Sequence, residues 1–169
     1  MGFLFGAKKK FVFDKEKEAV RVYKLFQSVC EGFKFKYKAN DEELSVELGI
    51  QGDNALMNIT LNVNKNIDVA YILSKLDFSV GEMCDDDVAQ ACNLVNTRLA
   101  FGSFDYNSKR NHVVFRIATN YTGMELTAES VKALLLSTYS TIDKYFKVLQ
   151  QVAQGEVSFE QFQKMMEAK

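Results

Sequence analysis

The chain has 169 residues, of which 47% are hydrophobic and 25% are charged. This length suits one domain with at most a short appendage, and the composition excludes disordered and collagen-like chains. Proline is absent, which excludes proline-rich linkers, proline ligand motifs and cis-proline turns. Lys and Arg total 21 against 22 Asp and Glu, so the chain lacks the cation surplus of a non-specific nucleic-acid binder.

The first half of the chain predicts one helix followed by strands. Asp14 is suited to cap a helix whose apolar residues recur at helical spacing, and Gly32 is expected to end it. From residue 33 to residue 78 the apolar period changes to two. This pattern predicts three strands of an antiparallel meander with one buried face and one face in water.

The second half predicts two helices and two strands, then a short last helix. Asp85 or Asp86 is expected to cap the middle helix, and Thr127 a long helix that ends at Gly155. Ser158 with Gln161 has the spacing of a capping box for the last helix. The expected order is α-β-β-β-α-β-β-α plus this short C-terminal helix. It favours the α+β class, in which helices cover one face of an antiparallel sheet.

The residues that enzymes use for catalysis are scarce. His112 is the one histidine of the sequence, and no nucleophile-elbow motif accompanies it. The three consecutive carboxylates Asp85–Asp87 do not have the alternating spacing of a calcium loop, so capping of a helix is the preferred interpretation. Glycines are dispersed and form no phosphate-binding loop. We therefore expect no enzyme activity, no catalytic residue, no cofactor and no metal.

Two further features bear on partners and compartment. Residues 33–38 alternate aromatic rings with lysines, which would allow bases to stack, but an amphipathic strand with inward rings explains the same pattern. No apolar run approaches the roughly 20 residues that cross a bilayer. Cys30, Cys84 and Cys92 form no CxxC motif. We predict a reduced, cytoplasmic protein that binds neither nucleic acid nor membrane.

Several apolar side chains are left over once the predicted core is filled. They either extend that core or form a surface for a partner, a role that suits Met and aromatic side chains. The candidate partner surface consists of Leu94, Leu136, Tyr139, Phe162, Met165 and Met166. The apolar residues of segment 1–13 could likewise extend the core or form part of a partner surface.

The second half also carries a family resemblance. Asn93–Asn96, Gly102–Asp105, Val114–Arg116 and the long helix with Asp143–Phe146 resemble the YbjN family of bacterial sensory-transduction regulators. The resemblance covers about residues 14–155. Members of the YbjN family have a fold similar to that of type III secretion chaperones. Residues 1–13 are then an N-terminal extension, and residues 156–169 a C-terminal helical tail.

This resemblance implies a binding role and no catalysed reaction. The chaperone-like relatives bind extended polypeptide, often as dimers. We expect a non-enzymatic regulatory or chaperone-like module that binds a protein, or a second copy of itself, through a sheet face or an apolar patch. The alternative is a small-molecule sensor with a pocket between sheet and long helix, lined by Tyr121, Tyr139 and Tyr145. The Asn93/Asn96 pair is expected to hold the middle helix to a neighbouring loop.

Overall fold

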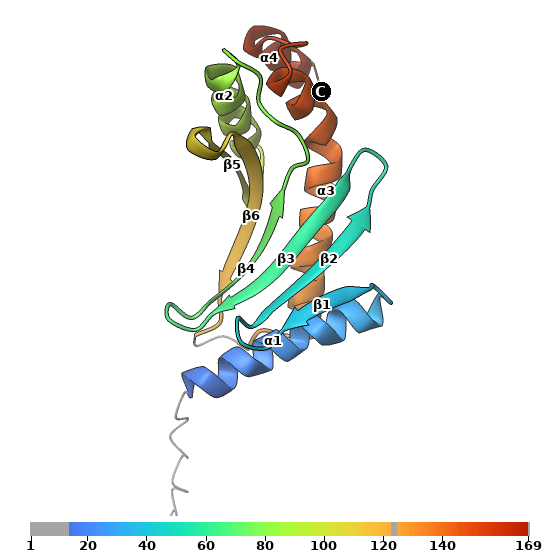
Figure 1. The fold of residues 1–169 in the computed structure, drawn as a ribbon, viewed down its shortest axis with the longest axis vertical. Coiled ribbons are helices and arrows are strands. Elements are labelled where there is room, and N and C mark those ends of the chain that lie inside the picture. Colours follow the sequence, from blue (N-terminus) through green and yellow to red (C-terminus); the bar gives the residue numbers. More distant parts are fainter. Residues whose placement is uncertain (1–13, 123–124, 169) are drawn as a thin grey trace, which may run out of the picture.

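The computed structural model describes residues 14–122 and 125–168. Within them, six strands form one antiparallel sheet in the order β1-β2-β3-β4-β6-β5 (Figure 1). In chain order the elements are α1 (Lys15–Gly32), β1 (Tyr37–Asn40), β2 (Ser45–Gln51), β3 (Leu56–Asn64), β4 (Val69–Lys75), α2 (Asp85–Asn96), β5 (Ser103–Asn107), the 3-10 turn η1 (Ser108–Arg110), β6 (His112–Asn120), α3 (Ala128–Ala153) and α4 (Phe159–Glu167). The predicted α+β class is confirmed.

The first half contains one strand more than the sequence predicted. β1 is a separate strand that pairs with β2, because the chain turns between residues 40 and 45. The turn is held by the Asn40 side-chain oxygen, which accepts hydrogen bonds from the amides of Glu42 and Glu43 at 3.1 Å each. Leu44 closes it with a φ of 48°. Glycine usually occupies such a left-handed position, so the turn had little sequence signal.

Alternation along the strands separates the two faces of the sheet as predicted. On β3, Met57, Ile59 and Leu61 are buried, whereas the intervening Asn58 and Thr60 face outward. Figure 1 shows α3 behind the sheet, α1 crossing one end, and α2 with α4 at the other end. The helices therefore cover one face, and the face toward the viewer is the outward one.

The helix α1 ends at Gly32, as the sequence predicted, but the reversal of the chain takes place at a later residue. The left-handed residue is Lys34, with a φ of 59°. Its amide donates to the Glu31 carbonyl and the Phe35 amide to the Cys30 carbonyl, both at 2.9 Å. This is the Schellman arrangement of a helix end. It reverses the chain so that the rings of Phe33 and Phe35 stack, with centroids 5.3 Å apart.

The middle helix α2 protects the edge of the sheet. The Asn96 side chain accepts a hydrogen bond from the Phe104 amide at 2.8 Å and donates one to the Phe104 carbonyl at 3.0 Å. Asn96 thus replaces a neighbouring strand at β5, so it holds the helix as expected, but to a strand and not to the predicted loop. Asn93 is exposed.

The N-terminus of α2 corrects one expectation. Its N-cap is Cys84, which makes no side-chain capping bond, and Asp85–Asp87 occupy the first helical turn. Asp85 accepts a hydrogen bond from the Tyr106 hydroxyl, and Asp87 accepts one from the Phe159 amide at 3.0 Å. The acidic run therefore connects α2 to β5 and to the start of α4.

The last helix packs against α2 and α3. The predicted capping box is confirmed, because Ser158 and Gln161 exchange side-chain hydrogen bonds with each other's backbone amides. Phe162 and Met166 face inward, with exposed fractions of 0% and 5%. The other end of α4 is held by Arg98, which donates to the Met166 carbonyl at 2.6 Å.

Candidate functional site

Two of the predicted surface residues, Leu136 and Tyr139 on α3, lie in one apolar groove. The loop after α1 and the strand β2 supply its other walls. We call it the Phe33–Leu136 groove; its lining is Phe33, Phe35, Ile50, Gln51, Leu135, Leu136 and Tyr139, and its volume is about 190 Å³. A second hollow of about 200 Å³ adjoins it and shares Phe33.

The groove combines rings, exposed aliphatic surface and one cation. Leu136 is 47% exposed because it lies off the buried stripe of α3, beside the fully packed Leu135. The Lys132 ammonium lies 5.6 Å from the centroid of the Phe33 ring. Lys132 also faces Glu129, with 3.9 Å between the ammonium and a carboxylate oxygen. The surface is thus apolar with a mixed-charge rim, the composition of a site that buries a partner's apolar side chain.

The remaining predicted surface residues do not join this groove. Phe162 and Met166 are wrong as surface residues, since they fill the contact between α4 and its neighbouring helices. Leu94 is half-buried against the core. Met165 is 43% exposed and lines a different hollow. An amphipathic helix pattern shows that one face is apolar but not which apolar residues lie at its rim.

Sequence reasoning missed Phe33, Phe35 and Ile50 as site residues. The alternating pattern predicts that the two rings lie on the inward side of a strand that begins at residue 33, whereas β1 begins at Tyr37. The one local feature that forms the groove is the left-handed backbone conformation of Lys34. A lysine rarely adopts this conformation, so the sequence does not predict it.

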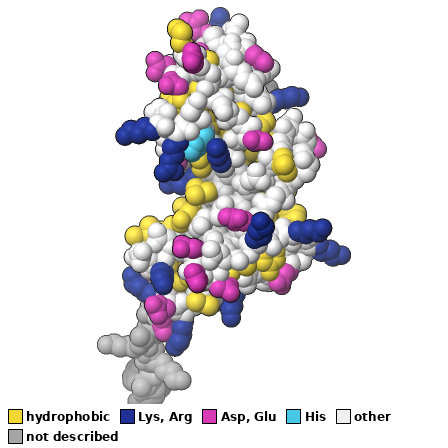
Figure 2. Space-filling model, in the orientation of Figure 1, with side chains coloured by type: hydrophobic (Ala, Val, Ile, Leu, Met, Phe, Trp, Pro, Cys, Tyr) yellow, Lys and Arg dark blue, Asp and Glu magenta, His cyan; other side chains and the backbone are white. Residues whose placement is uncertain are grey.

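The outward face of the sheet offers a broader hollow whose lining mixes charged, amide and apolar residues. Its volume is about 650 Å³, and its lining is Lys36, Tyr37, Lys38, Glu47, Leu48, Gly49, Asn58, Ile59 and Thr60. Figure 2 shows this face, which is largely white along the strands. Of the two surfaces the sequence left open, the apolar patch is therefore the better defined.

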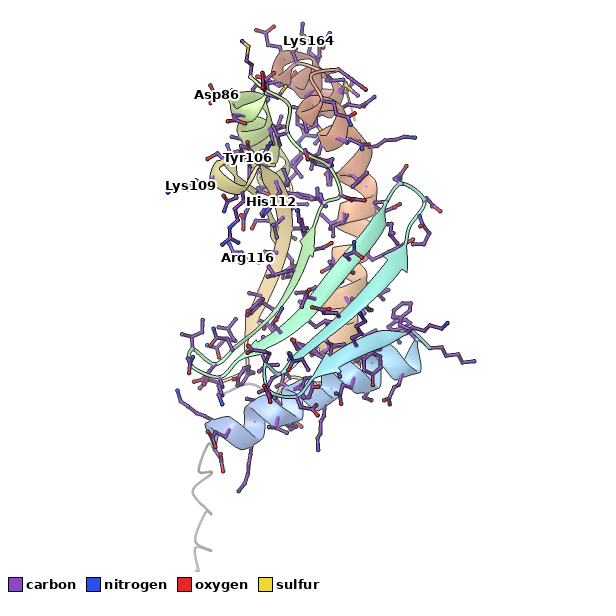
Figure 3. All side chains as sticks on the ribbon, viewed as in Figure 1. Asp86, Tyr106, Lys109, His112, Arg116 and Lys164 are labelled. Atoms are coloured by element: carbon purple, nitrogen blue, oxygen red, sulfur yellow. The ribbon has the colours of Figure 1, made fainter. Side chains whose placement is uncertain are left out.

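His112 lies among cations rather than in a catalytic arrangement. Figure 3 shows it with Lys109 and Arg116 on the β5–β6 hairpin, and Figure 2 shows dark blue side chains around it. Its Nδ1 lies 3.2 Å from the Arg110 carbonyl oxygen. Arg116 donates to Asp105 at 3.0 Å. These contacts are not those of a nucleophile, base and orienting acid.

Two of the three thiols are chemically shielded. All three cysteines are free, and burial raises the pKa of Cys30 to about 11 and that of Cys92 to about 12. Both side chains are therefore protonated and poorly nucleophilic at neutral pH. Cys84, half-buried at the start of α2, is the most accessible of the three.

Thiol labelling checks this difference. In the folded protein at mildly alkaline pH, iodoacetamide is expected to modify Cys84 and to spare Cys30 and Cys92 until denaturant is added. Peptide mass spectrometry gives the extent of modification at each position. Comparable rates at all three cysteines in the folded protein would contradict the burial described above.

The tyrosines of the alternative sensor pocket are not brought together. Tyr121 is fully buried, and its hydroxyl lies 3.5 Å from the Asn64 carbonyl oxygen to which it donates. Tyr139 lines the Phe33–Leu136 groove, whereas Tyr145 lines the hollow beside Met165. Among the described residues, no group of three or more His, Cys, Asp or Glu is placed to hold a metal ion.

Solved structures place this fold in a class. The chain is similar to the crystal structure of the ExsC–ExsE complex, with a TM-score of 0.60, 14% identity, and coverage of 78% of this chain and 96% of that chain. It is also similar to the HopA1–SchA chaperone–effector complex, with a TM-score of 0.57, 9% identity, and coverage of 80% and 99%. The fold is therefore that of type III secretion chaperones.

The family follows from a match in sequence. The YbjN family model, described as "Putative bacterial sensory transduction regulator", matches residues 28–151, more than half of the chain. This chain belongs to the YbjN family. Its fold is also similar to that of YbjN from E. coli, a structure titled a putative transcription regulator, with a TM-score of 0.57, 8% identity, and coverage of 79% and 92%. A search of curated proteins found no match.

One negative finding concerns membranes. Among the helices of residues 14–122 and 125–168, none combines the length and the apolar character that a membrane crossing requires.

Proposed function

We propose that this chain is a non-enzymatic regulatory protein of the bacterial cytoplasm that acts by binding a protein partner in the Phe33–Leu136 groove. The observation that carries the proposal is the groove itself. Stacked rings from the end of α1 meet an exposed leucine and a half-buried tyrosine of α3. Aromatic side chains such as these are enriched at protein–protein interfaces.

The fold and family support a binding role. Two structures that share the fold are titled as complexes, one of them between a chaperone and an effector. The family description names sensory transduction, which is a regulatory role. Neither names a reaction.

The shape of the groove indicates what the partner presents. The two adjoining hollows, of about 190 and 200 Å³, are each of side-chain size and meet at Phe33. We infer a polypeptide segment that inserts one large apolar side chain into each hollow. Lys132 at the rim then favours a carboxylate on the partner over a cation, although Glu129 moderates this preference.

Charge reversal in the groove tests this function. Replacing Leu136 by Glu places a carboxylate beside the rings and is expected to weaken partner binding by about 30-fold or more, a loss of about 2 kcal/mol. The fold should persist, because Leu136 is 47% exposed. The control is Ile67→Glu, which introduces the same charge at an apolar residue that is 62% exposed in the turn between β3 and β4, away from the groove lining.

The measurement is affinity capture from bacterial extract with quantitative mass spectrometry, followed by titration of the captured polypeptide. The wild-type protein and Ile67→Glu should retain the same polypeptide, and Leu136→Glu should lose it. Equal retention by both variants would remove the groove from consideration. Self-association that depends on Leu136 would show that the occupant is a second copy of the chain, which contradicts a distinct partner.

A further inference from the structure

A second hollow, separate from the groove, gathers positive charge. It lies where the C-terminal half of α3 meets α4, the segment after α2, and the turn between β2 and β3, which Figure 1 shows reaching toward α3. Its volume is about 380 Å³. The lining is Asn54, Arg98, Lys144, Tyr145, Lys147, Val148, Gln151, Met165 and Met166.

Three of these lining residues are cations, and none is acidic. Lys144 and Lys147 are neighbours on the surface of α3, since residues three apart on a helix lie on the same face. Arg98 approaches from the segment after α2 and is anchored through its bond to the Met166 carbonyl. A guanidinium has five N–H donors, so this single bond leaves donors for a ligand. The chain as a whole has a net charge of −1, so the cluster is a local excess.

Two nearby carboxylates, neither of them part of the lining of the hollow, accept hydrogen bonds from neutral amide groups. Asp143, next to Lys144 in sequence, accepts hydrogen bonds from the Asn54 amide at 2.8 Å and from its side-chain nitrogen at 3.2 Å. Glu167, which follows Met166, accepts one from Gln163 at 3.1 Å. The charges of Arg98, Lys144 and Lys147 therefore face the hollow without an acidic partner lining it.

The floor of the hollow is apolar. Tyr145 and Met166 are buried, Val148 is half-buried and Met165 is 43% exposed. The Lys144 ammonium lies 5.0 Å from the centroid of the Tyr145 ring, so the cation covers an aromatic surface. Cations above thioether and aromatic groups suit a ligand that carries carboxylates and apolar side chains together.

We propose that this hollow binds an acidic segment of a polypeptide, whose carboxylates pair with Arg98, Lys144 and Lys147 and whose apolar side chains contact Val148 and Met165. A polypeptide fits better than a small anion because the cations come from two separate elements and flank an apolar floor. The proposal rests on charge complementarity and does not depend on the Phe33–Leu136 groove.

A peptide titration tests the proposal. The probe is a short fluorescent peptide of alternating Glu and Leu, and fluorescence anisotropy reports binding to the full chain. Lys144→Glu combined with Lys147→Glu is expected to weaken binding about tenfold or more, because two attractions become repulsions. Binding by the wild type should also weaken as salt is raised. Lys24→Glu with Lys109→Glu is the control, since it changes the net charge equally at exposed sites on α1 and η1.

The outcomes separate this site from its alternatives. Equal weakening by the control pair would show general attraction and overturn the proposal. So would equal binding of the counterpart peptide with Gln in place of Glu. Displacement of the peptide by an equal concentration of inorganic phosphate would assign the hollow to a small anion and overturn the proposal.

The same titration keeps this hollow apart from the Phe33–Leu136 groove. Leu136→Glu should leave the affinity for the peptide unchanged, so a failure of this proposal can be distinguished from a failure of the proposed function. Lys144→Gln combined with Lys147→Gln removes the two positive charges without adding negative ones, and it should also weaken binding of the peptide.

Discussion

Replacing Asn96 by Leu is expected to lower the free energy of unfolding by about 2–4 kcal/mol. The substitution leaves both the amide and the carbonyl of Phe104 without their partner, and each buried polar group left unsatisfied costs about 1–3 kcal/mol. Both groups are partly buried, which favours the lower part of the summed range. The new side chain also adds no bond that could replace the two lost ones.

Urea denaturation measures this loss, with Asn93→Leu as the matched control. Asn93 lies one turn earlier on the same helix and is exposed, so the control should change the stability by no more than about 0.5 kcal/mol. If the two variants unfolded at the same urea concentration, Asn96 would not be what holds α2 to the sheet. The loss of Asn96 would also leave an unpaired strand edge at β5, where other chains can add.

Replacing Phe162 by Ala is expected to cost about 3–5 kcal/mol, the usual range for removing a fully buried Phe side chain. The ring is at the centre of the contact between α4 and its neighbours, and no other side chain of α4 except Met166 is buried. If Phe162 were instead part of a free partner surface, its removal would be nearly neutral.

Met165→Ala is the control for this substitution, because Met165 is 43% exposed on the same helix. It should change the stability by less than about 1 kcal/mol. Chemical denaturation gives both values, and amide hydrogen exchange reports whether α4 is loosened first. Equal losses in the two variants would contradict the packing of α4. We propose on this basis that the last helix belongs to the same domain as residues 14–155, and not to a separate tail.

Local signals in the sequence located most of the fold. Asp14, Thr127 and Ser158 each cap the helix that the sequence assigned to them, because a side-chain oxygen two or three residues before a free amide is a short-range interaction. Alternation on β3 likewise identified the buried face. The α+β class follows from these local elements.

The candidate site was less accessible to sequence reasoning, because it depends on long-range packing. The left-handed Lys34 turns the rings of Phe33 and Phe35 toward α3, and nothing in its residue type indicates this. Phe162 and Met165 look alike in the pattern of the last helix, yet one is buried and the other exposed. Only the position of α2 and α3 decides between them.

The central claim is that the partner contacts the Phe33–Leu136 groove, and site-specific photo-crosslinking tests it most directly. A photoreactive phenylalanine analogue would replace Tyr139 in the groove or, as the control, Asn58 on the outward face of the sheet. We predict that position 139 crosslinks in cells to one polypeptide other than the chain itself, and that Phe33→Asp in the same chain abolishes the product. A crosslink from position 58 with none from position 139 would contradict the account and assign the partner to the outward sheet face.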